Sequence, residues 1–189
     1  MAWTWDQLDS DQQANALLAA QVALGRFGNL GRQAVVNMVA IAGAESSMRA
    51  NASGDHYSQL SGSNRNLCLQ MNCNGYCSHG LWQIFAPVHR AMLVGMGAPD
   101  PLVVPCGTAN WLYDVFNCAR AARGVYDAQG YGAWTAYKTG AYLGWMDVAE
   151  QAVAMAEYQP SPPEGDNSWW GGIIAATTAL VIYLALKGR

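Results

Sequence analysis

Hydrophobic and polar positions follow a helical period over most of the chain. The segment 10–28 begins with a capping box formed by Ser10 and Gln13, continues with apolar residues and ends at a glycine. The segment 31–48 contains the run AVVNMVAIAGA, which is too long for a strand and too apolar to be exposed. We therefore expect this second segment to be the central buried helix of the domain.

Further helical patterns follow at 108–129 and 140–158, whereas 51–80 is rich in Asn, Ser, Gly and Cys and is typical of a loop. No alternation of apolar and polar residues typical of a strand extends over more than a few positions. The sequence therefore predicts a mainly α domain over residues 1–158.

The composition changes after residue 158. Residues 159–168 are polar and rich in proline, as is typical of a linker. Residues 169–187 include the uncharged run WWGGIIAATTALVIYLAL, whose length falls in the roughly 17–25 residues that a bilayer-spanning helix needs. The two tryptophans would lie at one membrane interface and Lys187 and Arg189 at the other. We predict a linker and a C-terminal transmembrane helix, with a buried core helix as the alternative.

Composition and charge limit the classes of function. Of the 189 residues 52% are hydrophobic and 12% are charged, which suits a packed core rather than a disordered chain. The net charge is −3 and basic residues do not cluster, so we expect no nucleic-acid partner. The first residues, MAWTWDQLDSDQQ, lack a basic segment followed by an apolar one, which predicts no cleavable signal peptide.

Glu45 follows the apolar run of the predicted central helix directly. A carboxyl group in apolar surroundings loses hydration, which raises its pKa toward neutrality. Such a group can hold a proton near neutral pH and donate it to a leaving oxygen, as cleavage of a glycosidic bond requires. Taken alone, a solvent-facing Glu at a helix end is the simpler interpretation, because lone acids rarely stay fully buried.

Three segments, in order, resemble the lytic transglycosylase and goose-type lysozyme superfamily. They are ESSMRANASGDHYS (45–58), SHGLWQI (78–84) and GAWTAYKTGAY (132–142). The family pattern is a Glu-Ser pair, an Asn-Ala and often a Gly-Asp, then Gly-Leu-x-Gln-Ile and later Ala-x-x-x-Tyr. The resemblance covers roughly residues 25–145. It implies a lysozyme-like helical domain that cleaves peptidoglycan.

The resemblance also implies roles for the matched residues. Glu45 would be the general acid and then the general base, Tyr137 would hydrogen-bond near it, and Gln83 would lie near the acid or the sugar N-acetyl group. Of the aromatic rings, most of which we expect in the core, Trp82 and Tyr137 are expected to contact sugar. The expected substrate-binding residues are Ser46, which would position the substrate or the acid, together with Gly80, Trp82, Gln83 and Tyr137.

The sequence departs from the family pattern in two places. Lys138 follows Tyr137 where the family tends to have Asn, and about twenty residues are inserted between Asp55 and Ser78. Asp55 is the candidate for a second carboxylate, and the insertion leaves its pairing with the cleft open.

The resemblance leaves two reactions open. In a transglycosylase the N-acetyl group stabilises the developing charge and the 6-hydroxyl attacks, which gives a 1,6-anhydro end. In an inverting muramidase Asp55 would position water. We expect the transglycosylase, because Asp55 lies on a glycine-containing loop rather than on a rigid element.

The insertion contains Cys68, Cys73 and Cys77, whereas Cys106 and Cys118 lie outside it. With His79 the first three could form a zinc site, but their spacing is not a standard one, so we expect no metal and no cofactor. Disulfides that brace the loop are favoured in an oxidising compartment. Five cysteines cannot all pair within one chain, and the pairing cannot be read from the sequence.

A murein-cutting domain with a membrane anchor and no signal peptide resembles the virion-associated lytic enzymes of bacteriophages that contain an internal membrane. The resemblance implies three partners: peptidoglycan glycan strands, the lipid membrane, and capsid or vertex proteins of the virion. It places the protein at the virion's internal membrane, with the bacterial cell envelope as the alternative. A non-catalytic murein-binding virion protein is the alternative function.

Overall fold

The computed structural model describes residues 2–71 and 73–158, which are mainly helical, as expected. The linker predicted at 159–168 and the transmembrane helix predicted at 169–187 lie outside the described residues. None of the helices in the described part of the chain combines the length and the apolar composition that a bilayer crossing requires. The α-helices are α1 (Ser10–Phe27), α2 (Arg32–Ser46), α3 (Gly62–Met71), α4 (Ala86–Gly95), α5 (Gly107–Tyr113), α6 (Val115–Gln129), α7 (Thr135–Lys138) and α8 (Met146–Glu157). The 3-10 helices are η1 (Trp5–Gln7), η2 (Gly28–Leu30), η3 (Tyr57–Gln59), η4 (Gly130–Ala133) and η5 (Ala141–Trp145).

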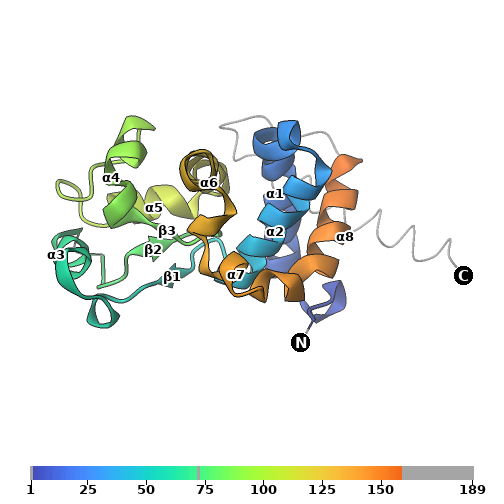
Figure 1. Ribbon diagram of the computed structural model, residues 1–189, viewed down its shortest axis with the longest axis horizontal. Helices are drawn as coiled ribbons and strands as arrows, with labels where there is room; N and C mark the ends of the chain where they lie inside the picture. The colour runs from blue at the N-terminus through green and yellow to red at the C-terminus, as the bar shows by residue number, and fades with distance from the viewer. Residues whose placement is uncertain (1, 72, 159–189) are drawn as a thin grey trace, which may run out of the picture.

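Helices α1, α2 and α8 pack against one another on one side of the molecule (Figure 1). Helix α2 is the central buried helix that its apolar run predicted. Within that run Val35, Val36 and all residues from Met38 to Ala42 are fully buried. Gly43 continues the buried face, and a Cβ there would collide with the indole ring of Trp145. That ring in turn stacks on Trp3 with the centroids 4.9 Å apart, so the absence of a side chain at Gly43 lets the N-terminus and η5 close over α2.

A three-stranded antiparallel sheet lies on the other side, together with α3, α4 and α5 (Figure 1). Its strands are β1 (Ser53–Gly54), β2 (Ser78–His79) and β3 (Ile84–Phe85), in that spatial order. Helix α6 lies between the sheet side and the α1–α2–α8 side and contacts α1, α4 and α5. The two sides are therefore joined through a shared helix whose core-facing residues are mostly alanines and valines.

Several element boundaries differ from the sequence-based prediction. The N-cap of α1 is Asp9 rather than Ser10, and its carboxylate accepts a 2.8 Å hydrogen bond from the backbone N–H of Gln12. The predicted helix at 108–129 is divided at Asp114, whose extended backbone ends α5 and whose side chain caps α6. The segment 140–158 begins with η5 before α8. Capping by an aspartate side chain explains the first two of these differences.

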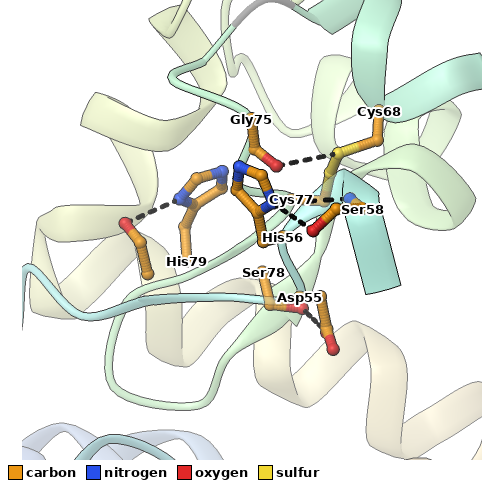
Figure 2. Close-up of a disulfide and its surroundings, with 9 residues drawn as sticks. Asp55, His56, Ser58, Cys68, Gly75, Cys77, Ser78 and His79 are labelled. Carbon is orange, nitrogen blue, oxygen red and sulfur yellow. Dashed lines mark hydrogen bonds between the residues drawn. A yellow bond between two sulfur atoms is a disulfide. The ribbon is translucent and has the colours of Figure 1, made fainter. Parts of the chain in front are cut away.

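The segment predicted as a loop contains η3 and α3, and two disulfides hold it. Cys68 at the end of α3 pairs with Cys77 immediately before β2 (Figure 2), and Cys73 pairs with Cys106 immediately before α5. Cys118 is a buried free thiol. The disulfides expected from the clustered cysteines are present, and one of them links the insertion to a part of the chain outside it.

Candidate functional site

Glu45 occupies the last turn of α2, where the buried helix reaches the surface, and its side chain is half-buried. The chain turns away at once, because Ser47 and Met48 both adopt the left-handed region, with φ of 53° and 58°. The backbone N–H of Ala136 in α7 donates a 2.9 Å hydrogen bond to Oε1 of Glu45. The carboxyl group is therefore held between the end of one helix and the start of another.

Burial raises the pKa of Glu45 above its ordinary value, because the charged form loses hydration. The negative charge of Asp55 raises that pKa further, whereas the Ala136 N–H and the positive charge of Lys138 lower it. These interactions show that Asp55 and Lys138 both lie within electrostatic reach of Glu45. The raised pKa agrees with the expectation drawn from the apolar run that precedes this acid.

Asp55 follows β1 directly and is exposed, with a left-handed φ of 53°. The hydroxyl of Ser78 in β2 donates a hydrogen bond to its Oδ2 (Figure 2). The β1–β2 register pairs Gly54 with Ser78, which brings the residue after Gly54 to the serine. The insertion thus leaves Asp55 beside Ser78, the first residue of the second family-like segment.

Gln83 is the last residue of the β2–β3 turn and also has a left-handed φ, of 46°. Its side-chain Nε2 donates hydrogen bonds to the carbonyl oxygens of Ala52 (3.1 Å) and Gly80 (2.9 Å). Its Oε1 lies against Gly54, where a Cβ would collide with it. The side chain therefore joins the residue before β1 to the β2–β3 turn through its two hydrogen bonds.

Gly80 is buried, with a φ of 79° that favours glycine. A Cβ at this position would collide with the carbonyl oxygen of Leu112 and would lie 2.6 Å from the Sγ of Cys118. The turn therefore packs directly on α5 and α6. The glycine permits this close approach, so in this structure its contacts are with the protein core.

Two of the expected substrate-binding side chains are buried. Trp82 is 0% exposed, and its Nε1 donates a 2.9 Å hydrogen bond to the carbonyl oxygen of Met38 in α2. Ser46 is 7% exposed, and its hydroxyl donates a 2.8 Å hydrogen bond to the carbonyl oxygen of Ala42. The expectations that the Trp82 ring contacts sugar and that the Ser46 hydroxyl touches substrate or Glu45 therefore need correction. Both side chains connect core elements, because their polar atoms find backbone partners inside the fold.

Tyr137 follows Ala136 in α7 and is half-buried. Its ring stacks between those of Tyr131 and Tyr142, at centroid distances of 4.8 Å and 4.9 Å. The hydrogen bond that this segment gives to Glu45 comes from the backbone N–H of Ala136, the residue before Tyr137. The rings on both faces of Tyr137 leave its edge and hydroxyl, rather than its flat faces, for other contacts.

The cysteines that the sequence offered as zinc ligands are bonded to one another or to Cys106. Cys68, Cys73 and Cys77 are all in disulfides, so they cannot act as thiolates. His79 is fully buried, burial lowers its pKa to about 4, and its Nδ1 lies 3.4 Å from the hydroxyls of Ser53 and Tyr113. Within residues 2–71 and 73–158, no group of three or more His, Cys, Asp or Glu side chains is placed to hold a metal ion.

The site that the structure assembles thus consists of a half-buried acid, a second carboxylate and a lysine. Sequence reasoning identified Glu45 and Asp55, but it treated Lys138 only as a departure from a pattern and missed Ala136 and Ser78. A proton held on Glu45 at neutral pH would suit donation to a leaving oxygen, with Asp55 available to orient a nucleophile. No protein-family model, no curated protein and no solved structure matches this chain.

Proposed function

We propose that this protein cleaves the β-1,4 bond between N-acetylmuramic acid and N-acetylglucosamine in peptidoglycan, with Glu45 as general acid and base on a lysozyme-like helical domain. The observation that carries the proposal is the half-buried Glu45 carboxyl, whose pKa is raised and which the Ala136 N–H orients. The order of the three family-like segments supports the choice of substrate.

In the proposed reaction the protonated Glu45 gives its proton to the glycosidic oxygen as the bond to the anomeric carbon breaks. The Ala136 N–H then stabilises the carboxylate that forms, because a donor at 2.9 Å favours the charged state. The substrate's own N-acetyl group stabilises the positive charge. The muramyl 6-hydroxyl forms the new bond to the anomeric carbon and returns its proton to Glu45, which regenerates the acid and leaves a 1,6-anhydro end.

A specific observation favours an inverting hydrolase as the second candidate. Asp55 lies within electrostatic reach of Glu45 and accepts a hydrogen bond from Ser78, so it is more firmly held than its place on a glycine-containing loop indicated. In that reaction Asp55 would take a proton from water while Glu45 protonates the leaving oxygen. Mass spectrometry of the released muropeptides separates the two candidates. Anhydro ends, together with activity in Asp55→Asn, support the first, and reducing ends, together with loss of activity in Asp55→Asn, support the second.

The test of the proposal is murein clearing by purified wild-type protein and by Glu45→Gln. The amide keeps the shape of the side chain but cannot donate an acidic proton, so we expect a loss of roughly 10²–10⁴ in rate. Glu150→Gln is the matched control, because it makes the same chemical change at a partly exposed carboxylate on α8, which pairs with Arg32. Equal clearing by Glu45→Gln and the wild type would contradict the proposal. Murein binding without clearing by the wild type would favour the non-catalytic murein-binding protein.

We further propose that the protein acts from a membrane, either the internal membrane of a phage virion or, as the alternative, the bacterial envelope. This part rests on the uncharged composition of residues 169–187 alone. The full chain should float with lipid vesicles. Ala179→Arg should weaken that association, because an arginine near the middle of a span costs roughly 2.5–3.5 kcal/mol on insertion scales. Unchanged flotation of the variant would show that this segment is not the sole anchor.

A further inference from the structure

Lys138 is the last residue of α7, the short helix that also carries the donor to Glu45. The helix is held at its start, because Nε1 of Trp134 donates a 2.9 Å hydrogen bond to the buried carbonyl oxygen of Trp82. The backbone N–H of Lys138 bonds to the carbonyl oxygen of Trp134 at 3.2 Å. The exposed Lys138 side chain therefore extends into solvent from a fixed backbone position, two residues after Ala136, whose N–H contacts Glu45.

Some basic side chains of the described residues pair with carboxylates and others, Lys138 among them, do not. Arg32 bridges to carboxylates on α8, and Arg90 and Arg123 pair with Asp100 and Asp127. Within residues 2–71 and 73–158, Lys138 forms no salt bridge, and its charge acts on Glu45 from a distance. A cation in this position favours the ionised form of Glu45 and so opposes its use as an acid. The position of Lys138 near Glu45 therefore indicates a role for the lysine other than assisting proton donation by Glu45.

We propose that Lys138 binds a carboxylate of the glycan next to the scissile bond, and that this contact makes the site prefer strands with free carboxylates over the same strands with those groups converted to neutral amides. This inference rests on the proposed function. The carboxylate has two sources in peptidoglycan: the lactyl group of a muramic acid without a peptide, or the stem peptide of one that carries it. An ammonium on a long flexible stem suits such a group, since it acts as a point charge with rotatable donors.

Binding of a carboxylate to Lys138 would also offset the lysine's lowering of the Glu45 pKa. An anion placed on Lys138 cancels the field that the lysine exerts at Glu45, and the proton affinity of Glu45 then rises when substrate is bound. Lys138 thus acts as a specificity-determining residue, and it links occupancy of the site to protonation of Glu45.

The experiment compares the full-length wild type, Lys138→Met, Lys138→Arg and Arg32→Met on paired substrates. These are peptide-bearing murein and peptide-free glycan strands, each before and after the carboxylates are converted to neutral amides. Arg32→Met is the matched control. It removes the same charge at the other end of α2, about 20 Å from Glu45 at 1.5 Å per residue.

We expect the wild type, Lys138→Arg and Arg32→Met to cleave the acidic substrate with a kcat/KM roughly tenfold above that for its amide, as one charge-assisted contact supplies. In Lys138→Met the ratio should fall to about one. At a pH low enough to keep Glu45 protonated in both proteins, the change should lie in KM rather than kcat. A preference confined to peptide-free strands identifies the lactyl carboxylate, and one confined to peptide-bearing murein identifies the stem peptide. An unchanged ratio in Lys138→Met, or an equal loss in Arg32→Met, overturns the inference.

Co-sedimentation of Glu45→Gln and the Glu45→Gln, Lys138→Met double variant with the same substrates measures the contact without cleavage. Stronger binding to the acidic form that disappears in the double variant supports the role of Lys138. Equal binding by the two proteins overturns it. Because this measurement does not use catalysis, failure of the murein-cleaving function and failure of the lysine contact give different results.

Discussion

The backbone N–H of Ala136 donates a 2.9 Å hydrogen bond to the Glu45 carboxylate across 91 positions of sequence. The bond joins α7 to the end of α2 and gives the half-buried carboxyl one fixed orientation. It favours the charged form of Glu45, yet the pKa stays above the ordinary value because burial has the larger effect. The acid is therefore both oriented and inclined to keep its proton, which is the combination that general acid catalysis needs.

The neighbouring charges should move the pH dependence of catalysis in opposite directions. The proposed reaction requires protonated Glu45, so we expect kcat/KM to fall as pH rises through the pKa of this group. Lys138→Met removes a charge that lowers this pKa, so the alkaline limb should move to higher pH, whereas Asp55→Asn removes a charge that raises it and should move the limb to lower pH. NMR titration of labelled glutamate side chains provides the same measurement without catalysis. Shifts of both variants in one direction would contradict the opposite effects of Asp55 and Lys138 on the Glu45 pKa.

Glu45→Gln should be more stable than the wild type at neutral pH. The folded-state pKa of Glu45 is raised, so the folded state binds this proton more tightly than the unfolded chain does. Stability is therefore lost as pH rises from the unfolded value, about 4.3, through the folded value, and a neutral amide avoids that loss. Thermal unfolding should give a higher Tm for the variant at neutral pH and nearly equal values below about pH 4. A lower Tm for Glu45→Gln at neutral pH, with Glu150→Gln unchanged, would argue against the raised pKa.

Trp82→Phe should affect stability rather than substrate binding. The substitution leaves a cavity in the core and removes the hydrogen bond to Met38, at a cost of roughly 2–4 kcal/mol. That cost corresponds to a Tm lowered by roughly 4–16 °C. The KM for murein, measured well below the Tm, should match that of the wild type. A raised KM with an unchanged Tm would return the ring to the sugar-contact role expected from the sequence.

Thiol chemistry should distinguish Cys118 from the other cysteines. It is the free cysteine of the described chain, and burial raises its pKa to about 12, so alkylating reagents should leave the native protein unmodified. Unfolding without a reductant should expose one reactive thiol, counted by mass spectrometry. Reduction should also lower stability by roughly 2–4 kcal/mol per disulfide, given the separations of 9 and 33 residues. Labelling of several cysteines in the unreduced, unfolded chain would contradict the pairing.

The sequence by itself determined the mainly helical class, the buried central helix and the acid at its end. These features depend on the local hydrophobic periodicity and on the residues next to Glu45 in the chain, which can be determined from the sequence alone. The same local signals predicted one helix over 108–129 and missed the break at Asp114, because a single capping side chain decided it.

Only the tertiary structure decided which side chains meet at the acid. The β1–β2 pairing brought Asp55 to Ser78 across the insertion, α7 brought Ala136 and Lys138 to Glu45, and core packing withdrew Trp82 and Ser46 from the site. The physical reason is that a side chain's partner depends on where distant segments pack and on which backbone groups are left to satisfy. Residue type and spacing reveal a family-like pattern, but they do not show which distant groups a side chain will contact.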